Sequence, residues 1–247
     1  MNNYSFTSIF RFMAVIGDSL SSGEFEIPNP NDSSSMSYID KIPYSWAQFL
    51  ARKNDLTMYN FTRGGMTAKE YINSFAQDHD FFNKKYQSQA YIIALGVNDL
   101  LARHFPMGNL DDIDTINYLN NKDSFIGDYA RIILKYKNIS PEAKFFLVNM
   151  PQEESDNKEH IQIKKDFNNL LYSLVKILKN CYVIDLYNKM PIYTNESKKL
   201  YYLNGHLSPM GYVYTAEIID NLIDEIIRNN PDDFKYIGLS DLIKTGL

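Results

Sequence analysis

Five short apolar stretches recur along the chain, and longer segments of mixed polarity separate them. The apolar stretches are mostly continuous rather than alternating, which is typical of parallel strands that are buried on both faces of a sheet. Their flanks are polar or glycine-containing, as expected where a strand gives way to a loop. We therefore predict five strands, at residues 12–17, 57–61, 90–95, 144–149 and 182–186.

The segments between these strands carry apolar residues at helical spacing. Thr67 and Glu70 have the spacing of a capping box, and Ser208 followed by Pro209 suits the start of a long final helix. Strands that alternate with helices indicate a parallel sheet with helices on both faces. The predicted helices cover residues 43–53, 67–77, 123–138, 158–180 and 209 to about 230.

Residues 26–41 interrupt this alternation with a polar, turn-rich stretch, EIPNPNDSSSMSYIDK. We predict a long loop there, of the kind that often covers or lines a binding site. No other stretch has the length and composition of a linker between domains. The pattern therefore predicts a single domain over residues 1–247.

Composition narrows the range of partners. The formal net charge of −5 disfavours a nucleic-acid partner, because contacts to phosphates need a basic surface.

The single cysteine, Cys181, lies in an apolar stretch and is expected to be buried, and no cysteine or histidine cluster has the spacing of a metal site. We expect no metal or other cofactor. The chain shows neither a signal peptide nor an apolar run near the roughly 20 residues of a membrane span, so we expect a cytoplasmic protein without a membrane partner.

Residues suited to catalysis follow the predicted strands. Ser19 comes after the first strand, Gly64 and Gly65 after the second, and Asn98 after the third, while His206 precedes the last helix. Because the carboxyl ends of parallel strands meet at one edge of a sheet, we expect these residues to lie close together. Nucleophilic catalysis needs a serine, a base and hydrogen-bond donors for an oxyanion, and this set supplies all three. Each residue also has a plain structural interpretation as a turn, cap or surface residue.

The motifs GDSL at 17–20 and GVND at 96–99, with a glycine between them and a late histidine, resemble those of the GDSL, or SGNH, family of esterases and acylhydrolases. The resemblance extends from Gly17 to the final helix. It implies an α/β fold, namely a three-layer α/β/α sandwich built on a flavodoxin-like, doubly wound sheet of about five parallel strands. It also implies ester hydrolysis through an acyl-enzyme.

The same resemblance assigns roles to residues. Ser19 would be the nucleophile and would give its backbone N–H to the oxyanion, together with the N–H of Gly65 and the side-chain amide of Asn98. His206 would be the general base. Counting from Asn60 favours Gly65 as the glycine donor, with Gly64 as the alternative.

One position departs from the family pattern. The family usually has an aspartate three residues before the histidine, and Leu203 stands there in this chain. An orienting group need only accept the Nδ1–H of the base and fix its tautomer. A backbone carbonyl near Leu203 or Asn204 would serve, and so would a carboxylate from elsewhere in the chain. The candidate carboxylates are those of Glu153, Glu154, Glu196 and Asp185.

The sequence favours a serine esterase that acts on small acyl esters, acetyl esters above all, of a small molecule or a glycan. Two alternatives stay open: a ligand-binding module of the same fold without turnover, and an acyltransferase or lysophospholipase-type acylhydrolase. Arg63, which precedes the glycine pair, is expected to form a structural ion pair or to contact a substrate anion.

Overall fold

The core of the molecule is a five-stranded parallel sheet in the order β4-β1-β5-β6-β7. The computed structural model describes residues 5–239. All five predicted strands are present, within one to two residues of their expected ends, and the predicted doubly wound α/β fold is confirmed. The strands are β1 (Phe12–Gly17), β4 (Thr57–Thr62), β5 (Ala90–Ala94), β6 (Lys144–Val148) and β7 (Cys181–Ile184).

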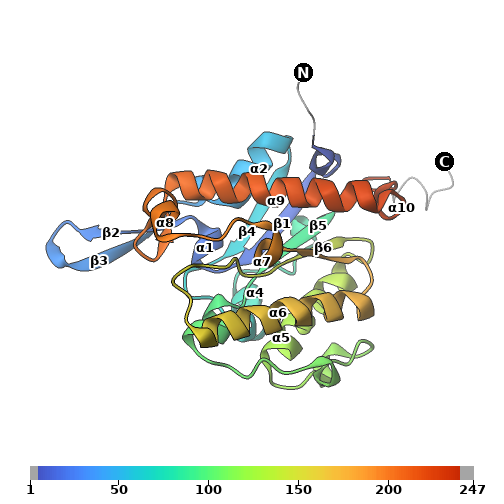
Figure 1. Ribbon diagram of the computed structural model, residues 1–247. Helices are drawn as coiled ribbons and strands as arrows, with labels where there is room; N and C mark the ends of the chain where they lie inside the picture. Colours follow the sequence, from blue (N-terminus) through green and yellow to red (C-terminus); the bar gives the residue numbers. More distant parts are fainter. Residues whose placement is uncertain (1–4, 240–247) are drawn as a thin grey trace.

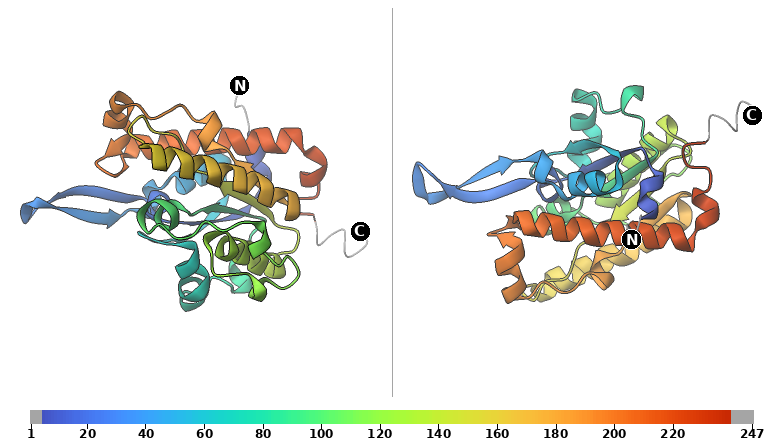
Figure 2. Two further views of the ribbon diagram at one scale, coloured as in Figure 1. Left: turned by 60° about the horizontal axis from the view of Figure 1, so that its bottom comes forward. Right: turned by 90° about the horizontal axis from the view of Figure 1, so that it is seen from above.

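Helices cover both faces of this sheet (Figure 1). Helices α2 (Trp46–Asn54) and α9 (Pro209–Asn229) lie on one face, and α5 (Phe125–Ile139) and α6 (Lys158–Ile177) lie on the other (Figure 2). Along β1, Ala14 and Ile16 face the α5–α6 side while Met13 and Val15 face the α2–α9 side, and all four are fully buried. Two apolar faces on one strand explain why its sequence is continuously hydrophobic.

Short helices connect these elements. A π-helical turn at Tyr71–Phe75 interrupts the predicted helix 67–77, and a second one at Val97–Ala102 follows β5. The short α-helices are α1 (Ser19–Ser22), α3 (Ala68–Glu70), α4 (Ala76–Asp78), α7 (Leu186–Lys189), α8 (Asn195–Tyr201) and α10 (Pro231–Phe234). The 3-10 helices are Phe6–Ile9, Ile42–Tyr44, Lys84–Tyr86, Leu110–Asp112 and Tyr118–Asn120.

The prediction of a loop at residues 26–41 is wrong, because most of this stretch forms an antiparallel β-hairpin of β2 (Glu24–Asn29) and β3 (Asp32–Asp40). The hairpin projects from the body of the molecule as a two-stranded arm (Figure 1). Its base is fixed to α1, because Lys41 N–H donates to the Gly23 carbonyl and Ser22 Oγ donates to Asp40. The turn-rich tip dominates the composition of the stretch and conceals the period-two pattern of its base.

A second small hairpin precedes α9. Strand β8 (Tyr202–Leu203) pairs with β9 (His206–Leu207), and Leu203 lies directly opposite His206 in the ladder. Asn204 adopts a left-handed φ of 55° in the two-residue turn, a conformation that asparagine tolerates better than most residues. This hairpin places His206 on a strand that contacts β2 and α1.

Two further expectations concern single features. Cys181 is buried at the start of β7, as predicted, and burial raises the pKa of its thiol to about 12. Within residues 5–239, no helix is long and apolar enough to cross a membrane.

Candidate active site

Ser19 is the first residue of α1, and only Asp18 separates it from the end of β1. Asp18 caps this short helix, since its carboxylate accepts a hydrogen bond from the N–H of Leu20 at 3.0 Å. Burial raises the pKa of Asp18 to about 7 against the opposing effect of that bond, and the neighbouring Asp99 and Glu24 raise it further. Ser19 Oγ makes no hydrogen bond to any group in residues 5–239, so its hydroxyl is uncommitted.

The glycine pair forms a tight turn after β4. Met66 N–H donates to the Arg63 carbonyl at 3.2 Å, which closes a four-residue turn. Gly65 has a φ of +70°, which a residue with a side chain rarely adopts at this turn position. At Gly64 a Cβ would clash with Oε2 of Glu24, so a larger residue there would displace the end of that side chain. The space beyond the Cα of Gly65 is open, since a Cβ there would meet no atom within 4 Å.

Asn98 lies in the π-helical turn after β5 and joins the other two segments. Its Nδ2 donates to the Met66 carbonyl at 3.1 Å and makes a longer contact of 3.4 Å to Oδ2 of Asp18. Its neighbour Asp99 is fully buried and accepts a hydrogen bond from Ala68 N–H at 3.0 Å. The ends of β1, β4 and β5 are therefore tied together around Asn98, as the sequence predicted for a shared sheet edge.

Donors for an oxyanion are available at this edge. Neither the backbone N–H of Ser19 nor that of Gly65 donates to a protein group within the described residues. The amide of Asn98 donates to the Met66 carbonyl at 3.1 Å and makes a longer contact of 3.4 Å with Oδ2 of Asp18, so an oxyanion would have to replace one of these acceptors. Two backbone N–H groups and one amide are the kinds of donor that an oxyanion hole uses.

His206 lies between two carboxylates that both come from β2. Its Nδ1 forms a hydrogen bond of 3.1 Å with Oε2 of Glu26, and the same oxygen accepts the Gly205 N–H at 2.8 Å. Its Nε2 lies 3.0 Å from Oε1 of Glu24. The imidazole and both carboxylates are mostly buried, with side-chain exposures of 13–16%. His206 therefore has a carboxylate partner at each ring nitrogen, although the sequence position of the family aspartate is occupied by Leu203.

The partner of Nδ1 is none of the groups that the sequence suggested. No backbone carbonyl is bonded to Nδ1 of His206 in the described part of the chain, and none of the four carboxylates considered from the sequence reaches it. Glu153 pairs with Lys198, Glu154 accepts Asn195 N–H, Glu196 pairs with Lys199, and Asp185 bonds Asn149, Tyr172 and Asn188. These acids are used in local structure near α8 and the end of β7.

The two glutamates differ in their protonation. Burial raises the pKa of Glu24, although His206 lowers it again in part. Burial also acts to raise the pKa of Glu26, but hydrogen bonds with His206 and the Gly205 N–H outweigh it and leave the pKa below the ordinary value. Glu26 is therefore the more firmly ionised of the two and is the better acceptor for an N–H of His206.

Tyr212 of α9 joins the hairpin to the serine. Its buried hydroxyl lies 2.8 Å from the Glu24 carbonyl and 3.3 Å from the Ser19 carbonyl. Burial raises the pKa of this hydroxyl far above its usual range, so it remains a donor. Because the Tyr212 hydroxyl contacts both segments, it helps to fix the position of β2 relative to Ser19.

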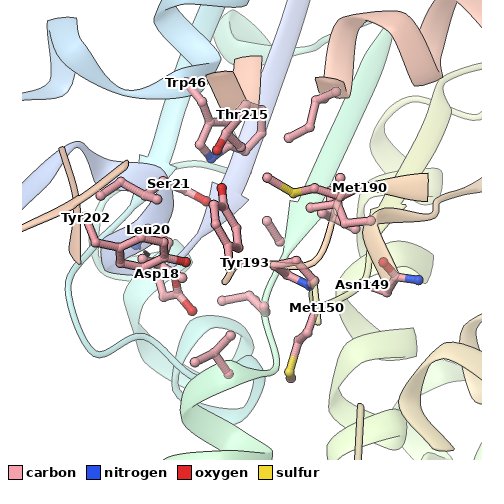
Figure 3. A pocket seen from close by; sticks show the side chains of 18 residues that line it. Asp18, Leu20, Ser21, Trp46, Asn149, Met150, Met190, Tyr193, Tyr202 and Thr215 are labelled. Atoms are coloured by element: carbon pink, nitrogen blue, oxygen red, sulfur yellow. Dashed lines mark hydrogen bonds between the residues drawn. The ribbon is translucent and has the colours of Figure 1, made fainter. Parts of the chain in front are cut away.

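Two cavities adjoin this edge and differ in chemistry. A cavity of about 80 Å³ lies behind it, among apolar side chains such as Trp46, Met190 and Tyr193 (Figure 3). Its wall includes Asp18 and Leu20, but none of Ser19, Gly65, Asn98 and His206. The second cavity, of about 460 Å³, is bounded by the Gly64–Gly65 turn and by charged and polar side chains. Its wall includes Gly65 but not Ser19, Asn98 or His206, so the open space beside Gly65 is polar.

Sequence reasoning missed Glu24, Glu26 and Tyr212. A signal for the glutamates was present, because Glu24 and Glu26 are two residues apart and lie on one face of any strand that contains them. Nothing local to the sequence indicates that this face meets a histidine 180 residues later. In the described residues, no group of three or more histidine, cysteine or acidic side chains is placed to hold a metal ion.

Known proteins that are similar to this chain show its family and its fold. A family model described as GDSL-like Lipase/Acylhydrolase matches residues 13–219. No curated protein sequence matches the chain. Solved structures with the same fold include the Lipase Lip_vut3 from a goat rumen metagenome, at 17% identity and a TM-score of 0.58, over 86% of this chain and 97% of that one.

Two carbohydrate esterases share the fold as well. One is a family two carbohydrate esterase from Clostridium thermocellum in complex with cellohexaose, at 15% identity and a TM-score of 0.57, over 90% of this chain. The other is a carbohydrate esterase family 2 enzyme with a carbohydrate binding domain from Corynascus thermopiles (Myceliophthora fergusii), at 16% identity and a TM-score of 0.58, over 86% of this chain. The chain spans 65% of the length of each of these two proteins.

Proposed function

Because the chain belongs to the GDSL-like lipase/acylhydrolase family, whose members are carboxylic ester hydrolases, we propose that it hydrolyses small acyl esters, acetyl esters above all, through an acyl-enzyme on Ser19. The polar cavity beside Gly65 supports a hydrophilic ester, such as an acetylated sugar, over a long-chain lipid. The carbohydrate esterases with the same fold lend this substrate class further support.

The reaction follows from the donors and acceptors at the sheet edge. Ser19 Oγ attacks the acyl carbonyl while Nε2 of His206 takes its proton, and the carbonyl oxygen becomes an oxyanion. The N–H groups of Ser19 and Gly65 and the amide of Asn98 stabilise that charge. The proton then passes from His206 to the departing alcohol, which breaks the ester bond. Water, activated by the same nitrogen, attacks the acyl-enzyme and releases the carboxylic acid.

Glu26 is the orienting acid in this proposal. A carboxylate on Nδ1 fixes the tautomer in which Nε2 carries the lone pair, and it stabilises the imidazolium that forms when Ser19 loses its proton. The observation that carries the proposal is this 3.1 Å contact between His206 and Glu26, because it supplies the one group that the sequence lacks at Leu203. The low pKa of Glu26 supports the same role.

Glu24 adds a condition to the mechanism. If Nδ1 carries the proton that Glu26 accepts, then Nε2 and the Glu24 oxygen are two acceptors only 3.0 Å apart, and a proton must lie between them. The raised pKa of Glu24 makes that proton easier to hold. His206 accepts the proton of Ser19 only after Glu24 has left Nε2, so we expect an arriving ester to displace the Glu24 carboxylate.

The direct test is hydrolysis of p-nitrophenyl acetate by the purified protein and by Ser19→Ala. We expect the substitution to reduce kcat by at least about 10⁴-fold, since a missing nucleophile leaves only the oxyanion donors and substrate binding. Ser21→Ala is the matched control, because Ser21 lies in the same short helix but in the wall of the apolar cavity. Equal rates for the wild type and Ser19→Ala would refute the proposed nucleophile.

The same proteins distinguish the alternatives. A fluorophosphonate should label wild-type Ser19, whereas a binding module without turnover would stay unlabelled with excess reagent. Product analysis with an added sugar acceptor separates hydrolysis from acyl transfer, because a transferase would form a new ester in place of the free acid.

A further inference from the structure

The polar cavity beside the Gly64–Gly65 turn is lined by three cationic side chains, Arg63, Lys69 and Arg103. Only one carboxylate, that of Glu70, lies in its wall. This balance is the opposite of that of the whole chain, whose formal net charge is −5. The cavity is therefore a local positive region on an acidic protein, and it adjoins the proposed site of ester hydrolysis.

The three cations differ in how far they are neutralised. Arg63 pairs with Glu70, and Lys69 pairs with Asp123, whose side chain is 75% exposed. Arg103 contacts no carboxylate within residues 5–239. One of its Nη nitrogens donates to the Gly65 carbonyl at 3.1 Å, and its remaining N–H groups are available. Arg103 therefore brings an uncompensated positive charge to the turn that carries the proposed oxyanion donor.

Both guanidinium groups are held in position. Arg63 lies over the ring of Phe75, with its guanidinium carbon 4.9 Å from the ring centre, and Arg103 is held by its bond to Gly65. A planar guanidinium that is already oriented presents paired N–H groups to a carboxylate and loses little entropy when it binds one. Lys69 adds a point charge at the same cavity.

The rest of the lining suits a sugar. Thr67, Asn73 and Glu70 supply hydroxyl, amide and carboxylate groups that can bond to hydroxyls, and Phe105 is the only large apolar side chain among the lining residues. A lysophospholipid would also need an apolar surface for its long chain, which the lining of this cavity does not offer. The lining thus favours a hydrophilic anion over a lipid.

We propose that this cavity binds the carboxylate of an acidic sugar, so that the preferred substrate is an acyl ester of a uronic acid. Arg103 is the principal ligand of the carboxylate, Arg63 and Lys69 support it, and the ester lies toward Gly65 and Ser19. This inference rests on the proposed esterase function and deepens it by naming the charge of the substrate.

The test compares two acetate esters of equal size. One is a methyl glucuronide and the other is the matching methyl glucoside, acetylated at the same hydroxyl, so that they differ by a carboxylate in place of a hydroxymethyl group. We expect wild-type kcat/KM for acetate release to be about tenfold higher for the glucuronide, as a charge-assisted hydrogen bond would give. Raising the salt concentration from about 50 to about 500 mM should reduce this preference.

Substitutions assign the preference to the cavity. Arg103→Gln keeps a donor for the Gly65 carbonyl but removes the charge, and it should lower the glucuronide-to-glucoside ratio to near one. Arg103→Lys keeps the charge and should retain most of the ratio. Lys176→Gln is the control for net charge, because Lys176 lies in α6 and outside the cavity lining, and it should keep the wild-type ratio. A wild-type ratio near one, or an unchanged ratio in Arg103→Gln, would overturn the inference.

A binding measurement separates this inference from the esterase proposal. Calorimetric titration of Ser19→Ala protein with both esters should show tighter binding of the glucuronide, and the further substitution Arg103→Gln should remove the difference. If wild-type protein releases acetate from neither ester nor from p-nitrophenyl acetate, the esterase proposal fails, while the titration still tests the cavity. Equal affinity for the two esters would refute the acidic-sugar site even if hydrolysis is observed.

Discussion

The two sides of Ser19 are built in different ways. On one side, Gly65 and Asn98 follow β4 and β5, which are the direct neighbours of β1 in the parallel sheet. On the other side, His206 lies on a two-residue strand and is held by glutamates from a hairpin that projects from the body of the molecule (Figure 1). The first side depends on the core of the fold, whereas the second depends on contacts between two peripheral segments.

This difference separates two kinds of requirement in the proposed reaction. Oxyanion donors stabilise the transition state best when they are already in position, because no free energy is then spent on moving them during the reaction. A packed sheet edge provides that rigidity. The base must exchange partners, since Nε2 of His206 faces Glu24 before it can take the proton of Ser19. Glu24 lies at the base of the hairpin, where its backbone is held by Tyr212, so only its side-chain carboxylate has to move in such an exchange. Substitutions on the two sides should therefore differ in size and in pH dependence.

The largest effect is expected from Glu26→Gln on the histidine side. The amide retains the size of the side chain but can stabilise neither the required tautomer nor the imidazolium of His206. We therefore expect kcat to fall by about 10³- to 10⁴-fold, which is near the loss seen when the aspartate of a catalytic triad is neutralised. Steady-state hydrolysis of p-nitrophenyl acetate measures it. Glu153→Gln, Glu154→Gln and Glu196→Gln are matched controls and should each stay within about tenfold, because their carboxylates pair elsewhere.

A second substitution sharpens this test. Leu203 lies opposite His206 in the β8–β9 ladder, so an aspartate at position 203 would have its Cβ within about 5.5 Å of that of the histidine. We expect Leu203→Asp to restore at least about tenfold of the activity lost in Glu26→Gln, because one acid on Nδ1 replaces another. A loss of less than tenfold in Glu26→Gln would show instead that no carboxylate is needed on this side.

The same division explains what the sequence predicted. The order of the buried strands was enough to predict that one sheet edge holds Ser19, Gly65 and Asn98, because each of them follows a recognisable strand. Glu26 was hidden, because its partner lies 180 residues away and because the Pro, Asn and Ser residues of the hairpin tip have the composition of a loop. Local patterns encode strands and turns, whereas the docking of a peripheral hairpin depends on tertiary contacts such as those of Tyr212.

On the oxyanion side, Asn98→Ala should reduce kcat by about 10²- to 10³-fold, the usual cost of one oxyanion donor. KM should change little, because this donor acts mainly on charge that develops in the transition state. The measurement is again ester hydrolysis, with circular dichroism to show that the fold is retained. A reduced affinity with unchanged kcat would mean that Asn98 serves only to hold Met66 and Asp18 in place.

A smaller effect, of a different kind, is expected from Glu24→Gln. Burial raises the pKa of Glu24, so this carboxyl group titrates at a higher pH than an ordinary glutamate, next to Nε2 of His206, whereas the amide of the variant does not titrate. We expect the acid limb of the kcat/KM profile to shift by about 0.5 to 1 pH unit, because the contribution of Glu24 to it is lost. Asp40→Asn is the control, since Asp40 bonds Ser22 at the base of the same hairpin and does not contact His206. A loss near 10³-fold without a shift would identify Glu24, rather than Glu26, as the orienting acid.

The smallest effect on catalysis, below about tenfold, is expected from Asp99→Asn, which instead reports on the rigidity of the oxyanion side. Burial raises the pKa of Asp99 from 3.8 to about 7, so the folded protein binds this proton more tightly than the unfolded chain does. Its contribution to stability is complete below pH 4 and is lost as pH rises toward 7, by up to about 4 kcal/mol. The amide side chain of the variant would keep an acceptor for Ala68 N–H without titrating. Urea unfolding at pH 5 and at pH 8 measures how far the free energy of unfolding falls between the two, and this fall should be smaller in Asp99→Asn than in the wild type. An equal fall would mean that another group titrates, with Asp18 as the first candidate.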